Sequence, residues 1–342
     1  MPEPVARRFR PMKRWRALAA LALLVIIAAA GAGAWWLNQP LALAADSVEL
    51  SIEPGTAPRE IAQAWVQAGV RTSATALYEW FRWSGQSRKI RSGSYEIGPG
   101  VTPLMLLNKM VRGDETLAVV RLIEGWTFRQ FRAELAKADA LKPTTASMSD
   151  EQIMQALGAP GVAPEGRFHP DTYAYSKGSS DLAVLRRAYR AMQQRVDAAW
   201  QERAPDTPLQ SADDALVLAS IVEKETGVGA DRGRVAGVFM NRLRIGMPLQ
   251  TDPTVIYGLG AAFDGNLHKR DLLADTPFNT YTRTGLPPTP IAMPGKAALL
   301  AAVRPDPTKA LYFVARGDGS SEFSDTLADH NRAVNRYQRR GK

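Results

Sequence analysis

The chain of 342 residues contains no cysteine and only three histidines. Without thiols there is no disulfide, no thiolate metal site and no cysteine nucleophile. His169, His268 and His330 are far apart in the sequence and match no metal-ligand spacing. The G-x-S-x-G turn of many serine hydrolases is also absent. Zinc and serine-hydrolase chemistry are therefore disfavoured, and no metal or other cofactor is predicted.

The net positive charge outside the N-terminal segment is small. Residues 1–16 hold six basic residues and one acidic residue, so +5 of the net charge of +9 lies there and only +4 on the rest of the chain. A nucleic-acid-binding protein needs a basic face on its folded part. We therefore predict no nucleic-acid partner and interpret residues 1–16 as a cytoplasmic basic segment beside a membrane.

Charge is missing altogether from residues 17–37, which are rich in Ala, Leu, Ile and Val. At 1.5 Å per residue a helix of this length spans a hydrocarbon core of about 30 Å. The preceding basic cluster predicts a single-pass membrane anchor with a cytoplasmic N-terminus and an extracytoplasmic remainder. The alternative is a signal peptide cleaved near residues 42–44, but the apolar run is longer than a usual signal segment.

Hydrophobic and charged contents of 45% and 23% are typical of globular proteins. A weak internal repeat occurs at residues 48–66, 94–111 and 119–135. Each copy has a short alternating stretch, a glycine turn, a threonine suited to N-capping and an amphipathic helix. A further helix is expected after Ser73. These patterns predict an α+β module at 48–117, either a spacer or a ligand-binding module.

The stretch LVLASIVEKETG, residues 216–227, predicts a helix that ends in charged residues. Leu218, Ile221 and Val222 share one side of this helix with Glu225, whereas Glu223 points about 200° away from Glu225. A carboxyl group held against apolar surface has a raised pKa, as a general acid requires. The alternative is an ordinary helix end with solvated charges.

Long segments with little helical pattern follow, at residues 244–293, between a helix at 234–243 and a final helix, strand and helix. They are rich in Tyr, Phe, Leu and Pro, which argues against disorder. Their polar side chains suit a groove for a neutral, hydroxyl-rich polymer, although each could instead cap a turn. The candidates are Asn241, Arg242, Gln250, Thr251, Asp252, Tyr257, Asn279 and Tyr281.

Four segments in order resemble the bacterial endolytic murein transglycosylase family (MltG, YceG-like): SIVEKETG, VFMNRLRIGMPLQTDPTVIYG, FNTYTRTGLPPTPIAMPG and LYFVARGDGSSEFSDTLADHN. The resemblance covers residues 1–342. It implies an α+β protein with a transmembrane helix at 17–37, a LysM-like module at 48–117 and a lysozyme-like catalytic domain at 118–342. It also implies that the anchor lies in the inner (plasma) membrane and that the catalytic domain is periplasmic. Arg167 and His169 depart from the family pattern, which affects only the expected substrate contacts.

The resemblance further implies cleavage of the bond between N-acetylmuramic acid and N-acetylglucosamine within glycan strands of peptidoglycan, leaving 1,6-anhydro ends. Termination of nascent strands and peptidoglycan synthases as partners are additional expectations. The catalytic glutamate of the family corresponds to Glu225. It would protonate the glycosidic oxygen and then accept a proton from the muramic acid C6 hydroxyl as that hydroxyl attacks C1.

Two other functions remain open from the residues. A muramidase-type hydrolase would act on the same glycan with water as the nucleophile and a second carboxylate, for which Asp252 is the best candidate. A non-catalytic cell-wall binding or scaffold protein would bind glycan and release nothing from it.

Overall fold

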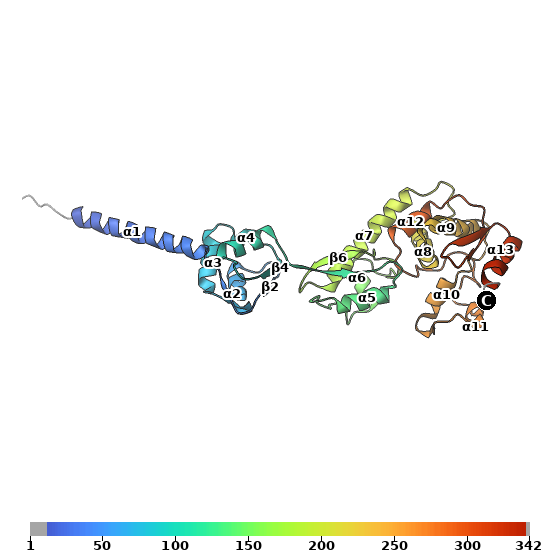
Figure 1. Cartoon of the computed structure of the whole chain (residues 1–342), viewed down its shortest axis with the longest axis horizontal. Coiled ribbons are helices and arrows are strands. Elements are labelled where there is room, and N and C mark those ends of the chain that lie inside the picture. The colour runs from blue at the N-terminus through green and yellow to red at the C-terminus, as the bar shows by residue number, and fades with distance from the viewer. Residues whose placement is uncertain (1–11, 340–342) are drawn as a thin grey trace, which may run out of the picture. The chain divides into compact units, whose positions relative to one another are not determined.

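A computed structural model describes residues 12–339 of the chain (Figure 1). The chain divides into two compact units. Unit 1 extends to Leu117 and includes Ser176–Gly178, and unit 2 contains Ala118–Tyr175 and the chain from Ser179 onward. The predicted mixed α and β composition is confirmed, because both units combine helices with two-stranded sheets.

The N-terminal helix α1, Met12–Leu37, is long and apolar enough to cross a membrane over Leu18–Leu37. This stretch corresponds to the predicted anchor at 17–37. Trp15 and Trp35 are exposed near its two ends. Residues 1–11 of the predicted basic segment lie outside the described residues.

Unit 1 builds its core between three helices and a β pair. Its elements after α1 are β1 Ala42–Leu43, β2 Val48–Ile52, α2 Pro58–Ala68, β3 Val70–Arg71, α3 Ala74–Trp83, η1 Ser87–Lys89, β4 Gly93–Ile97 and α4 Pro103–Arg112. Strands β2 and β4 are antiparallel, with Leu50 opposite Tyr95. Trp65, Phe81 and Tyr95 are fully buried, so apolar burial stabilises this unit independently.

The repeat pattern predicted strand–turn–helix units, and the structure contains them, with one correction. The hydroxyls of Thr102 and Thr127 cap helices as expected. At the start of α2 the capping group is instead the Glu60 carboxylate, which accepts the Ala57 backbone N–H. The N-cap position of α2 is Ala57, so Thr56 lies one residue too early to cap the helix. Its hydroxyl donates instead to the Glu53 carbonyl.

Unit 2 is mainly helical and has two apolar clusters. Its elements are β5 Leu117–Arg121, α5 Phe128–Lys137, α6 Asp150–Ala156, β6 Thr172–Ser176, α7 Asp181–Gln201, α8 Ala212–Glu225, α9 Gly229–Arg244, α10 Asp252–Leu259, η2 Gly260–Ala262, α11 Lys269–Leu273, α12 Lys296–Val303, β7 Tyr312–Ala315, β8 Ser321–Ser324, α13 Leu327–Val334 and η3 Asn335–Arg339. One cluster surrounds Phe168 and α5, and the other surrounds α8.

Helix α8 is the centre of the second cluster, and it differs from the sequence prediction of a single apolar face. Residues 215–222 are all buried, because α7, α9, α10 and α12 pack around them. The side chain of Ser220 is accommodated there because its hydroxyl donates to the Val217 carbonyl and accepts from the Ile291 N–H. A helix that is apolar all round is typical of the interior of a domain.

The predicted loop region 244–293 contains two short helices, α10 and α11, and the hairpin strand β8 was also not predicted. Helix α10 has only eight residues and a glycine at position 258, so its sequence has little helical periodicity. Tertiary packing stabilises such short helices: α10 packs against α8 and buries Val255.

Candidate functional site

Glu225 is the last residue of α8, and its carboxylate is held from one side by a hydroxyl. Helix α8 ends there because Thr226 adopts an extended conformation. The Thr251 hydroxyl donates to Oε2 of Glu225 at 2.7 Å. Burial raises the pKa of the Glu225 carboxyl; the Thr251 hydrogen bond and the charge of Arg242 oppose this, whereas the charge of Asp252 adds to it. A buried carboxyl of this kind keeps its proton at higher pH than a solvated one.

Thr251 is itself fixed by its neighbours. It is buried, and its N–H donates to the Thr280 hydroxyl at 3.1 Å. The Thr254 hydroxyl donates to the Thr251 carbonyl at 2.8 Å and lies 2.9 Å from the Thr280 hydroxyl. Gln250 has a positive φ of 51°, a strained conformation for a side chain of this kind. The segment before α10 is thus held in one conformation with Thr251 directed at Glu225.

A cavity of about 530 Å³, here called the Glu225 cavity, opens beside this carboxylate. Its lining combines the end of α8, the segment before α10, the hairpin β7–β8 and the C-terminal helices. The lining residues include Glu225, Arg242, Gln250, Asp252, Tyr281, Tyr312 and His330. Four of the predicted site residues around Glu225 are therefore brought together: Arg242, Gln250, Asp252 and Tyr281.

Asp252 provides a second carboxylate at this cavity. The Tyr281 hydroxyl donates to its Oδ1 at 2.5 Å. Its charge also acts on Glu225, because it raises the pKa of that carboxyl. The two carboxyl groups therefore differ in their surroundings: the Glu225 group has a pKa raised by burial and accepts the Thr251 hydroxyl, and the Asp252 group accepts the Tyr281 hydroxyl.

Arg242 both lines the cavity and supports its wall. Its Nε donates to the Leu311 carbonyl at 2.7 Å, and its Nη1 donates to the Leu249 carbonyl at 2.8 Å. Its guanidinium lies 5.2 Å from the centre of the Tyr312 ring. The arginine thus joins the chain before α10 to the start of β7, and its charge lowers the pKa of Glu225.

Two predicted substrate contacts do not line the Glu225 cavity, because their amides bond to the backbone. The Asn279 side-chain amide donates to the carbonyls of Asp271, Leu272 and Ala274, and the residue is 1% exposed. The Asn241 amide donates to the carbonyls of Thr308 and Ala310, beside a different cavity. Asn241 and Asn279 therefore stabilise turns and loops, which is the alternative that the sequence left open for these polar residues.

The two glutamates of α8 face different partners. The Glu223 carboxylate accepts the Gly295 N–H at 2.9 Å, at the start of α12. Burial raises its pKa as well, but Glu223 does not line the Glu225 cavity. The helical spacing in the sequence likewise predicts that the Glu223 and Glu225 side chains point in different directions.

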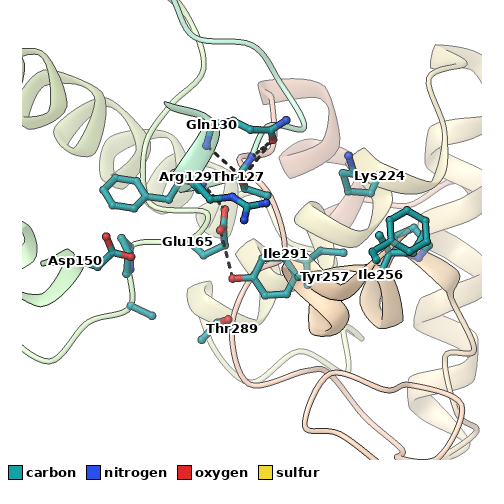
Figure 2. A pocket seen from close by; sticks show the side chains of 16 residues that line it. Thr127, Arg129, Gln130, Asp150, Glu165, Lys224, Ile256, Tyr257, Thr289 and Ile291 are labelled. Carbon is teal, nitrogen blue, oxygen red and sulfur yellow. Dashed lines mark hydrogen bonds between the residues drawn. The ribbon is translucent and has the colours of Figure 1, made fainter. Parts of the chain in front are cut away.

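Tyr257, the remaining predicted contact, lines a second cavity of about 700 Å³, here called the Glu165 cavity (Figure 2). The Tyr257 hydroxyl donates to Oε2 of Glu165 at 3.3 Å, and the Phe128 N–H donates to Oε1 at 3.0 Å. Burial raises the pKa of Glu165 to about 7. Gly166 has a φ of +79° and its Cα faces Pro290 so closely that no side chain fits there.

Sequence reasoning missed Glu165 and His330. Glu165 is the first residue of an aromatic and polar segment at 165–175, and a glycine follows it directly. A glycine at this position can indicate a buried turn, and this was the signal in the sequence for Glu165. Of the two residues that depart from the family pattern, Arg167 pairs with Asp213 at 2.6 Å and His169 is buried. Neither lines the Glu225 cavity or the Glu165 cavity.

The comparisons of this chain with known proteins agree with one another. A sequence model of the YceG-like family matches residues 50–336. The endolytic murein transglycosylase of Bacillus subtilis strain 168 is 31% identical over 308 residues, which cover 85% of this chain and 85% of that relative. The endolytic murein transglycosylase of Streptococcus pneumoniae serotype 2 strain D39 is 24% identical over 355 residues, which cover 92% of this chain and 64% of that relative. A crystal structure of a yceG-like protein from Listeria monocytogenes matches with a TM-score of 0.52 and 27% identity, covering 84% of this chain and 98% of the other.

Proposed function

The chain belongs to the YceG-like family, and we propose that it is a lytic transglycosylase that cleaves murein glycan strands internally at the Glu225 cavity. The observation that carries this proposal is the buried Glu225 carboxyl, held by the Thr251 hydroxyl at the wall of a cavity large enough for sugar rings. The names of two relatives, both endolytic murein transglycosylases, support the substrate class.

Glu225 acts first as a general acid. Burial raises the pKa of its carboxyl, so the protonated form that must donate to the glycosidic oxygen persists to higher pH than in a solvated glutamate. The Thr251 hydroxyl occupies Oε2 as a donor, which leaves Oε1 as the oxygen that carries and delivers the proton. Breaking the glycosidic bond leaves positive charge at C1 of the muramic acid.

The same carboxylate then acts as a base. The C6 hydroxyl of the muramic acid attacks C1, and its proton passes to Glu225, which restores the starting protonation state and forms the 1,6-anhydro ring. The nucleophile belongs to the sugar that is being cleaved, so the reaction gains the advantage of an intramolecular step and needs no positioned water.

Asp252 is proposed to stabilise the positive charge that develops at C1. Its carboxylate borders the Glu225 cavity and accepts the Tyr281 hydroxyl, which orients it. Gln250 and Tyr281 are proposed as contacts for the sugar acetamides and hydroxyls, since both line the same cavity. Arg242 is proposed to support this wall while its charge faces the carboxylates.

The decisive experiment is digestion of purified, uncrosslinked glycan strands with the wild-type chain and with Glu225→Gln, followed by mass spectrometry of the products. We expect anhydro ends from the wild type and a loss of at least about 100-fold in rate for the variant. Reducing ends in place of anhydro ends would favour the hydrolase, and binding without any release would favour the scaffold protein.

Glu223→Gln is the matched control, because Glu223 sits on the same helical turn but accepts the Gly295 N–H away from the cavity. We expect it to retain most activity. Folding of Glu225→Gln should be unimpaired. Burial raises the pKa of the Glu225 carboxyl, so its ionisation lowers the free energy of unfolding as pH rises, and glutamine removes this loss. A folded, active Glu225→Gln protein would contradict the assignment.

We further propose that unit 1 is a LysM-like module and that unit 2 has a lysozyme-like catalytic core. Two β–turn–α units in unit 1 and the central buried helix α8 in unit 2 support these proposals. The basic residues before the apolar helix support an N-terminus in the cytoplasm and unit 2 in the periplasm. Peptidoglycan synthases are proposed as partners from the substrate alone.

A further inference from the structure

The Glu165 cavity lies against the same two helix ends as the Glu225 cavity. Lys224 and Glu225 are consecutive on α8, and Lys224 lines the Glu165 cavity whereas Glu225 lines the Glu225 cavity. Asp252 and Pro253 are consecutive on α10, and Pro253 lines the Glu165 cavity whereas Asp252 lines the Glu225 cavity. A polymer with side branches that binds at Glu225 therefore has a second cavity within reach of its branches. The residues of this second cavity have no part in the proposed reaction.

Most neutral polar and acidic groups of the Glu165 cavity already have partners inside the protein. The pairs are Thr127 hydroxyl to Gln130 Oε1 at 3.2 Å, Thr289 hydroxyl to Pro290 carbonyl at 3.1 Å, Tyr257 hydroxyl to Glu165 at 3.3 Å, and Asp150 with Arg132 at 2.8 Å. Sugar hydroxyls need both donors and acceptors from a binding site. Few acceptors remain here, so the cavity is poorly suited to a saccharide.

The groups that remain are cationic donors and an apolar wall (Figure 2). The Arg129 side chain is exposed and has no hydrogen bond or ion pair within residues 12–339. The Lys224 ammonium gives one hydrogen bond, to the Gly125 carbonyl at 3.3 Å, and has two further N–H groups. The wall consists of Ala163, Pro164, Pro253, Ile256, Phe263 and Ile291. A complementary ligand must bring carboxylates and small apolar groups.

We propose that the Glu165 cavity binds the carboxylate-bearing peptide attached to the muramic acid residues of murein, while the glycan of the same strand occupies the Glu225 cavity. This inference rests on the proposed function, because murein is a glycan whose muramic acids carry short peptides of alanine and acidic amino acids. The alanine methyl groups match the apolar wall, and the carboxylates match Arg129 and Lys224.

The distances permit one strand to occupy both cavities. Tyr257 follows Asp252 along α10, and the helical rise separates them by about 7.5 Å along the axis. An extended peptide of about four residues spans about 13 Å. The acidic Glu165 is compatible with an anionic ligand, because burial raises the pKa of its carboxyl to about 7 and so reduces its negative charge at neutral pH.

The experiment compares two substrates with the full-length chain in detergent: uncrosslinked strands that carry their peptides, and the same strands after enzymatic removal of the peptides. We expect Arg129→Gln to raise KM about tenfold for the peptide-bearing strands and to leave KM for the stripped strands and both kcat values unchanged. Arg190→Gln is the matched control, because Arg190 is exposed on α7 and lines neither cavity. It should change neither substrate's kinetics.

Binding provides a second readout that does not need turnover. Fluorescence anisotropy with labelled peptide-bearing strands should show about tenfold weaker binding when Arg129→Gln is added to Glu225→Gln. Equal KM increases for both substrates, or no change for either, would overturn the inference. If the wild type binds peptide-bearing strands through Arg129 but cleaves neither substrate, the proposed function fails and the peptide site stands.

Discussion

Two glutamates two residues apart on α8 are proposed to have different chemical roles, because their carboxylates have different surroundings. Glu225 faces a cavity and receives the Thr251 hydroxyl, whereas Glu223 receives the N–H of Gly295 at the start of α12. Burial raises the pKa of both carboxyls. A raised pKa therefore does not distinguish the two carboxyls, and the proposal of Glu225 as the acid rests on its place in the cavity lining.

Replacing Thr251 by valine tests how Glu225 is oriented. Thr251→Val keeps the side-chain shape but removes the hydroxyl that donates to Oε2 at 2.7 Å. Because this hydrogen bond lowers the pKa of Glu225, its loss should move the alkaline limb of the pH–rate profile to higher pH. We also expect kcat to fall about tenfold as the carboxyl loses its orientation.

The control for this substitution is Thr172→Val, at an exposed position of strand β6 where valine is well tolerated. Its pH–rate profile should match that of the wild type. An unchanged profile for Thr251→Val would mean that the hydroxyl does not position the acid.

Asn279 shows how a residue predicted as a substrate contact can instead support the fold. Its amide donates to three carbonyls of α11 and the following turn, and its Oδ1 accepts the Tyr281 N–H. Asn279→Ala should lower the free energy of unfolding by about 2–3 kcal/mol, because buried carbonyls lose their donors. Urea denaturation measures this change. The matched variant Asn266→Ala, in an exposed turn, should leave the free energy of unfolding nearly unchanged. A raised KM with unaltered stability for Asn279→Ala would instead support Asn279 as a substrate contact.

At the scale of elements, Glu165 joins α5 to α10 through one carboxylate. It accepts the first N–H of α5, from Phe128, and the hydroxyl of Tyr257 on α10. This geometry places a titratable group between two helices that line the Glu165 cavity. The stability of their contact must therefore depend on pH.

The direction of that dependence follows from the raised pKa. The pKa of Glu165 is about 7 in the fold against an ordinary value of 4.5, so its contribution to stability is fully present below about 4.5 and is lost as pH rises through about 7. The loss amounts to about 3 kcal/mol. Glu165→Gln should remove most of it, so that unfolding free energies at pH 5 and pH 8, from urea titrations followed by circular dichroism, differ less than in the wild type.

Asp197→Asn serves as the control for this change, since Asp197 is exposed on α7. It should leave the difference between the two pH values as it is in the wild type. A Glu165→Gln protein with the full wild-type difference would show that another group produces it.

At the scale of the whole molecule, the chain combines an apolar helix, α1, with two units that each bury their own core. The basic cluster before α1 predicts which side of the membrane the units occupy. The absence of cysteine makes this prediction easy to test, because a single introduced cysteine is unique.

Ser47→Cys in intact cells should react with a membrane-impermeant maleimide, because Ser47 is exposed after α1 and is predicted to be extracytoplasmic. Pro4→Cys should react only after the membrane is permeabilised. The reverse pattern of labelling would contradict the predicted topology.

The sequence alone determined the features that depend on local pattern. The charge-free stretch at 17–37, the helix in the stretch 216–227, and the threonine caps of α4 and α5 follow from hydropathy period and capping chemistry, which act over a few residues. The family motifs pointed to Glu225, and helical spacing separated it from Glu223 because the angle between two residues of a helix is set by their separation.

Only the tertiary structure decided which polar residues meet. Thr251 bonds to Glu225, and Asp252 and Tyr281 line the same cavity, across chain separations of 26 to 56 residues. The amides of Asn241 and Asn279 donate instead to backbone carbonyls. Glu165 came to lie between α5 and α10 in the same way. An amide or carboxylate can bond to a ligand or to a buried backbone group with similar energy, so its sequence position does not determine its partner; packing does, because it leaves some groups in a cavity and surrounds others with unpaired N–H and C=O groups.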